Sequence, residues 1–129
     1  MSIEFKNPEG VAPPVASYRH VAIVSGASRL LVLAGQVGQA VDGSFPVTVE
    51  QQFEQALDNV LAIVTSEGGS AASVARLSCF LTEPPKNFAE IASSMQRLFP
   101  DGPPAMSWIY VAGLFAPNVK VEIEAIAGL

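Results

Sequence analysis

Two carboxylates near the C-terminus, Glu122 and Glu124, are of a type that can support acid/base chemistry. They stand in the segment VKVEIEAIA, residues 119–127, where apolar and polar side chains alternate. Because strand side chains alternate between faces, this pattern predicts a strand whose carboxylates share one face. A carboxylate on a solvated sheet face is usually structural, whereas one buried at a subunit interface is suited to proton transfer. Glu122 is therefore a candidate acid/base group, with a solvated strand residue as the alternative.

A second candidate group lies upstream, in the segment PAMSWIY, residues 104–110. Alternation predicts a strand on which Met106 and Trp108 share one face. Met is flexible and Trp presents a large face with one donor, so the pair suits an adaptable apolar binding site. Large apolar side chains more often pack in a core or a subunit interface, and that is the alternative.

Two amphipathic helices and an intervening strand are predicted to position these segments. Residues 48–69 begin with the capping-box pair Thr48 and Gln51, carry apolar side chains at helical spacing, and end in two glycines. Residues 87–99 show the same apolar spacing. Between the helices, residues 74–81 alternate as a strand does.

The N-terminal part predicts a β-hairpin over residues 18–38, around a turn at residues 25–28. Tyr18 on its first strand is typical of a packing aromatic, with a ligand role as the alternative. His20 is interpreted as a structural or surface histidine. Cys79, between leucines on an apolar face of the strand predicted at residues 74–81, is interpreted as a small core residue rather than a nucleophile.

The predicted order is β-β-α-β-α-β-β within a single domain, residues 1–129. Two amphipathic helices cover only one face of such a sheet, which predicts a two-layer α+β architecture. The other face must be polar or buried by a partner chain. A content of 50% hydrophobic and 15% charged residues also favours an oligomer.

Composition excludes several classes of protein. The net charge is −5 and the basic residues are scattered, so nucleic-acid binding is not expected. One Cys and one His leave no disulfide framework and little material for a metal site, and none is predicted. We find no signal-peptide pattern and no apolar run near the ~20 residues of a membrane span, so we expect a cytoplasmic protein without a membrane partner.

Five segments, in this order and spacing, resemble the Rid family of reactive-intermediate deaminases, also called the YjgF or endoribonuclease L-PSP-like family. The similarity spans nearly the whole chain. The segments are LLVLAGQVG, QALDNVLAIV, SVARLSCFLTE, PAMS and VEIEAIA.

This resemblance implies a chorismate-mutase-like α+β fold that assembles as a homotrimer, with small-molecule ligands in clefts between subunits. Family members with the deaminase pattern hydrolyse imines and enamines to keto acids and ammonia without a cofactor. In that pattern, an Arg in P-A-R-S holds the substrate carboxylate, and a Glu in the last strand positions a water molecule.

The sequence departs from this pattern at the Arg position, which Met106 occupies. Trp108 stands where Cys is common, and Ala92 where an Asn is often found. The resemblance implies Glu122 as the catalytic residue. The substrate-binding set that it implies is Tyr18, Gly35, Ala92, Met106, Ser107 and Trp108.

Replacing Arg by Met removes a contact that contributes ~1.5 to 3 kcal/mol, so we expect a ligand without a carboxylate. Arg19 or Arg97 could supply a substitute cation. Three functions remain open: hydrolysis or tautomerisation of an imine or enamine that lacks a carboxylate, non-catalytic binding of an apolar metabolite by a trimer, and a protein-interaction or chaperone-like trimer.

Overall fold

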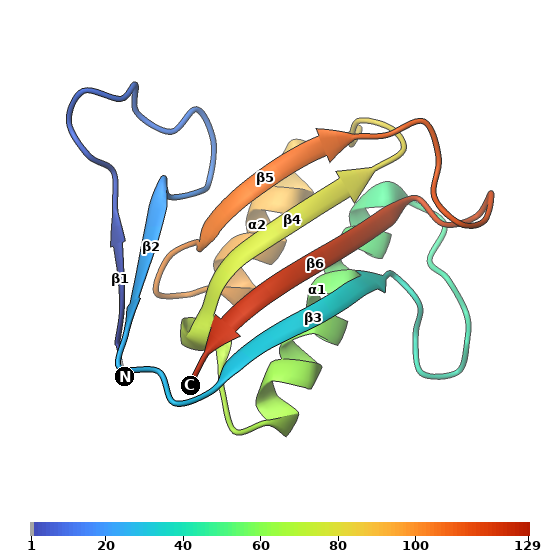
Figure 1. Cartoon of the computed structure of the whole chain (residues 1–129). Helices are drawn as coiled ribbons and strands as arrows, with labels where there is room; N and C mark the ends of the chain where they lie inside the picture. The colour runs from blue at the N-terminus through green and yellow to red at the C-terminus, as the bar shows by residue number, and fades with distance from the viewer. Residues whose placement is uncertain (1) are drawn as a thin grey trace.

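The computed structural model describes residues 2–129 (Figure 1). Besides the strands and helices, the described residues form a 3-10 turn at Ala71–Ser73. The elements are β1 (Ser2–Lys6), β2 (Val21–Ser25), β3 (Leu30–Val37), α1 (Val49–Ser66), β4 (Val74–Leu81), α2 (Phe88–Leu98), β5 (Ala105–Tyr110) and β6 (Val121–Gly128).

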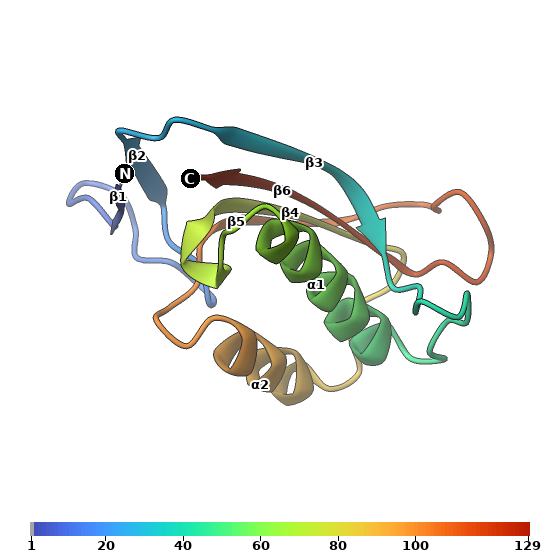
Figure 2. The same ribbon diagram turned by 90° about the horizontal axis from the view of Figure 1, so that it is seen from below.

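The main sheet has four strands in the order β3-β6-β4-β5. β4 and β5 run parallel, and β6 runs antiparallel to both β3 and β4. Both helices lie on the same side of this mixed sheet, as Figure 2 shows. The predicted two-layer α+β architecture is therefore confirmed, and one face of the sheet carries no helix.

Helix α1 forms where apolar spacing and end signals predict it. Thr48 caps its N-terminus by accepting a hydrogen bond from the Gln51 backbone at 3.1 Å. Gly68 follows its C-terminus with φ +89°, a conformation that glycine adopts without steric cost. The buried face of α1, including Phe53 and Leu57, packs on the inward side chains of β6 and β3.

The N-terminal hairpin differs from the prediction. β2 does not pair with β3. It pairs instead with β1, an additional strand not expected from the sequence, and the two form a separate antiparallel sheet with Ile3 opposite Val24. β3 pairs with β6, placing Leu31 opposite Ala127. The long-range pairing of β3 with β6 replaces the local turn because β6 offers β3 a full-length antiparallel partner whose inward side chains complete the core.

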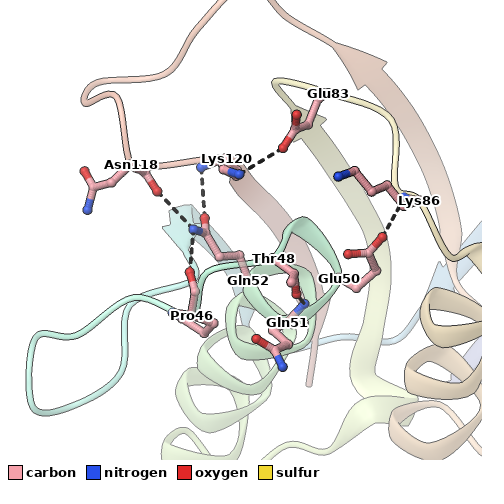
Figure 3. A network of polar contacts seen from close by, with 9 residues as sticks. All are labelled: Pro46, Thr48, Glu50, Gln51, Gln52, Glu83, Lys86, Asn118 and Lys120. Carbon is pink, nitrogen blue, oxygen red and sulfur yellow. Dashed lines mark hydrogen bonds and ion pairs between the residues drawn. The ribbon is translucent and has the colours of Figure 1, made fainter.

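A buried glutamine fixes the start of β6 (Figure 3). The side-chain amide of Gln52 donates to the carbonyls of Pro46 and Asn118, both at 2.9 Å. Its amide oxygen accepts from the Lys120 backbone at 2.9 Å. Since β6 begins at the next residue, this network sets the position from which Glu122 projects.

Candidate functional site

An apolar cleft of about 710 Å³ lies between the segment that precedes β2, helix α2 and strand β5. Five of the seven predicted site residues line it. The full lining is Val15, Ala16, Ser17, Tyr18, Phe88, Ile91, Ala92, Met95, Met106, Ser107, Trp108, Ile109 and Tyr110.

Strand β5 presents Met106 and Trp108 on the helix side of the sheet. They lie opposite Leu77 and Cys79 of β4, whose side chains are fully buried under the helices. Both Met106 and Trp108 pack on the edge of the core. Met106 and Trp108 thus pack on the core and also line the cleft, and their role as ligand contacts stays a prediction.

Trp108 is held by aromatic rings from both helices. Its ring centroid lies 5.4 Å from that of Phe53 on α1 and 6.3 Å from that of Phe88 on α2. Its indole N–H is buried and has no hydrogen-bond partner within residues 2–129. Phe88, at the start of α2, and Ala92, one turn further on, are both exposed, so the apolar side chains of α2 extend beyond those that pack in the core. These two exposed side chains form part of one wall of the cleft.

The wall opposite α2 comes from the segment before β2. Tyr18 packs edge-on against His20, with ring centroids 5.7 Å apart. The Nε2–H of His20 donates to the Ala12 carbonyl at 2.8 Å, a tautomer assigned from this contact. His20 therefore has the structural role that the sequence indicates, and it ties the segment carrying Tyr18 back on itself. Val15, which no sequence pattern pointed to, also lines the cleft from this segment.

The cleft has no charged lining. No Asp, Glu, Lys or Arg appears among the described residues that form it. Arg19 turns away toward Phe5 and the Asp101 carbonyl. Arg97 pairs with Glu54 of α1. Neither arginine takes the place of a cation beside Met106 within the chain.

Glu122 lies on the other face of the sheet, the face without helices. On β6 it stands between Phe80 of β4 and Val37 of β3, and its neighbours Val121 and Ile123 are fully buried on the helix side. Within residues 2–129 the Glu122 carboxylate makes no hydrogen bond or ion pair.

Gly35 leaves the space that the Glu122 side chain fills. A Cβ at residue 35 would lie 2.2 Å from Glu122 Oε1. Lys120, a possible partner just before β6, pairs with Glu83 at 3.0 Å instead. The structure therefore places Gly35 and Glu122 together, apart from the cleft.

Cys79, the remaining candidate nucleophile, does not line the cleft. Cys79 is fully buried, and burial raises the pKa of its thiol to about 12, so it is an inert core residue as interpreted.

Within residues 2–129, no group of three or more His, Cys, Asp or Glu side chains could hold a metal ion. No helix of the described chain has the length and apolarity to cross a membrane.

Comparison with known proteins agrees with the fold. A family model described as Endoribonuclease L-PSP matches residues 9–129. This chain belongs to the Rid, or YjgF, family.

Rid-family relatives span most of its length. The RutC family protein YjgH of Escherichia coli K12 is 28% identical over 120 residues, covering 93% of this chain and 90% of YjgH. The 2-iminobutanoate/2-iminopropanoate deaminase of the same organism is 32% identical over 103 residues, covering 77% of this chain and 79% of the enzyme. The crystal structure of YyfB, a Rid protein of unknown function from Yersinia pestis, has a TM-score of 0.88 and 30% identity, with full coverage of both chains.

The geometry of this Rid-family chain divides the predicted site into two parts. Tyr18, Ala92, Met106 and Trp108 contribute to the cleft on the helix side. Ser107 lines the same cleft, but its hydroxyl accepts a hydrogen bond from Arg76 Nη2 at 2.7 Å on the other side of the strand. Gly35 and Glu122 lie on the face without helices. One copy of the chain therefore does not bring the carboxylate and the cleft together.

Proposed function

We propose that this Rid-family chain assembles as a homotrimer and hydrolyses or tautomerises a small imine or enamine that lacks a carboxylate. The site would lie between subunits, with the cleft of one copy facing the helix-free sheet face of another. Glu122 would position the water molecule or move the proton. No resident cofactor is required for this reaction.

The observation that carries the proposal is the uncharged cleft. Met106 and Trp108 offer hydrocarbon and aromatic surface, and no lining side chain offers a cation to a carboxylate. A charge-assisted contact with Arg contributes ~1.5 to 3 kcal/mol, so its absence weakens the binding of a carboxylate roughly ten- to a hundredfold. The unpaired Glu122 would repel an anionic ligand further.

Assembly is supported by what the helix-free face exposes. Leu30 is 63% exposed and Val32 is 73% exposed on β3, and Glu122 makes no ion pair within residues 2–129. Apolar side chains on an uncovered sheet face favour burial by another copy. A trimer is the assembly that the family resemblance implies, and it would join both halves of the site.

The chemistry needs few groups. Water adds to the imine carbon while Glu122 accepts one of its protons, and the nitrogen is protonated as the C=N bond becomes single. The C–N bond of the resulting aminoalcohol then breaks, ammonia leaves, and a carbonyl product remains. Proton transfer by a positioned side chain contributes typically ~10² to 10⁴ in rate.

The test is ammonia release from two freshly generated imines, a neutral aromatic imine and 2-iminopropanoate. We expect the natural chain to accelerate only the neutral imine. Glu122→Gln should lower that rate by ~10²-fold or more. Met106→Arg should gain activity on 2-iminopropanoate by roughly ten- to a hundredfold, because it restores an anion contact.

The matched control is Glu124→Gln, since Glu124 is exposed one alternation further along β6. It should retain the natural rate, and light scattering should give the same oligomeric mass for every variant. Rapid turnover of 2-iminopropanoate by the natural chain would contradict the substrate assignment. Equal rates for Glu122→Gln and Glu124→Gln would contradict the role of Glu122.

A non-catalytic trimeric binding module is the second candidate. It is favoured by the cleft lining, which within residues 2–129 contains no carboxylate, imidazole or thiol. Benzyl alcohol is a suitable probe because it is neutral and aromatic. Its binding can be followed by fluorescence, because Trp108, the chain's single tryptophan, lines the cleft. A change in fluorescence and a rise in melting temperature, with no imine turnover, would favour this function over catalysis.

A further inference from the structure

A second cleft, of about 410 Å³, lies between β1, the 3-10 turn and the connection from α2 to β5. Its walls are mainly apolar. The lining is Ile3, Phe5, Arg19, Ser70, Ala71, Ala72, Val74, Phe99, Pro100, Asp101, Gly102 and Pro104. Tyr18 and Arg19 thus serve different clefts although they are adjacent in sequence.

Two contacts hold the Arg19 guanidinium at this cleft, and a glycine leaves space for it. Its Cζ lies 4.8 Å from the centre of the Phe5 ring, a cation–π distance. Its Nη2 donates to the Asp101 carbonyl at 3.2 Å. A Cβ at Gly102 would lie 1.9 Å from Nη2, so the absence of a side chain there provides the space for the guanidinium. The positive φ of Gly102, +108°, further restricts that residue to glycine.

Arg19 is half-buried and makes no ion pair within residues 2–129. A guanidinium has five N–H donors, and one of them is used by the Asp101 carbonyl. A cation that is pre-positioned over an aromatic ring with donors to spare is suited to a planar carboxylate. The surrounding Phe5, Phe99 and Pro104 suit a hydrocarbon body.

We propose that this second cleft binds a small organic monocarboxylate, with the carboxylate held by Arg19 and the hydrocarbon body among the apolar walls. A phosphate is disfavoured. Arg19 is the one basic residue among those that line the cleft, and Asp101 is an acidic one, so a dianion would lack compensation. This site is separate from the uncharged cleft and does not depend on the function proposed for it.

Calorimetric titration tests the proposal with three probes: phenylacetate, its neutral analogue phenylacetamide, and inorganic phosphate. The natural chain should bind phenylacetate roughly ten- to a hundredfold more tightly than phenylacetamide. Arg19→Gln should remove that preference, whereas Arg29→Gln should keep it because Arg29 pairs with Glu67 elsewhere. Amide chemical shifts should move at Phe5 and Gly102 when phenylacetate is added.

The outcomes separate the alternatives. Shifts confined to Met106 and Trp108, an unchanged preference in Arg19→Gln, or tighter binding of phosphate than of phenylacetate would each overturn the proposal. If Arg19→Gln does not fold, Arg19→Lys serves in its place. Arg19→Lys keeps the charge but loses the planar fork and should weaken phenylacetate severalfold, so an unchanged affinity there would likewise overturn it.

Discussion

The two faces of the main sheet differ in how far a single chain satisfies them. On the helix side, Leu77, Ile123 and Leu81 are fully buried. On the other side, Val32 is mostly exposed, and the Glu122 carboxylate has no partner within residues 2–129. Both faces arise from the same strand alternation. A single chain therefore completes the packing of the helix-side face and leaves the other face uncovered.

The largest expected effect is on the helix side. Leu77→Ala removes a fully buried side chain and leaves a cavity, which should cost ~2 to 5 kcal/mol of the free energy of unfolding. Urea unfolding followed by circular dichroism measures this loss. Leu30→Ala is the matched control, since Leu30 is 63% exposed on the opposite face. Equal losses for the two variants at every protein concentration would contradict the division between the faces.

The next effect tests assembly through the exposed face. Val32→Asp adds a charge to a strand position that we propose to be covered by another copy, and burying an unpaired charge is costly. We expect the concentration at half-dissociation of the oligomer to rise at least ~10-fold, measured by analytical ultracentrifugation. Val41→Asp, in the loop after β3, adds the same charge at a fully exposed position and serves as control. An unchanged mass for Val32→Asp would place the interface elsewhere.

Much of the helix-covered face could be predicted from the sequence because its signals are local. Apolar spacing, the Thr48 cap and the alternation around Cys79 each act within a few residues. The N-terminal hairpin could not be predicted, because the partner of β2 is β1, a short strand of mixed polarity.

The candidate site was predictable only in part, for a different physical reason. Local spacing places Met106 and Trp108 on one face, and the structure brings Tyr18 and Ala92 beside them. Alternation on separate strands, however, does not say which face of β5 matches which face of β6. Sheet register alone decides that Glu122 lies on the face opposite Met106.

The smallest expected effect comes from replacing a carboxylate by its amide, either at Glu50 or at Glu122. Glu50, buried in the first turn of α1, accepts a hydrogen bond from the Lys86 backbone N–H at 2.6 Å (Figure 3). It also accepts one from the Asn87 backbone N–H at 3.0 Å, and so anchors the start of α2. Glu50→Gln should lose ~1 to 2 kcal/mol of unfolding free energy near neutral pH, because charge-assisted acceptors are stronger than neutral ones. Glu122→Gln has no such contact to lose and should stay within ~0.5 kcal/mol.

The difference in unfolding free energy between the natural chain and Glu50→Gln should depend on pH, and the shifted pKa of Glu50 sets the direction of that change. The backbone N–H of Asn87, with smaller contributions from the backbone of Glu50 itself and from Lys86, lowers the pKa of Glu50 below its ordinary value of 4.5. A lowered pKa in the folded state means that ionised Glu50 stabilises the fold above the unfolded value, and that this stabilisation is lost as pH falls through the lower folded value. The gap between the natural chain and Glu50→Gln should therefore hold between pH 7 and about 5.5 and shrink in acid. Thermal unfolding across this range measures it, and a gap that widens in acid would show that Glu50 is not the ionised anchor of α2.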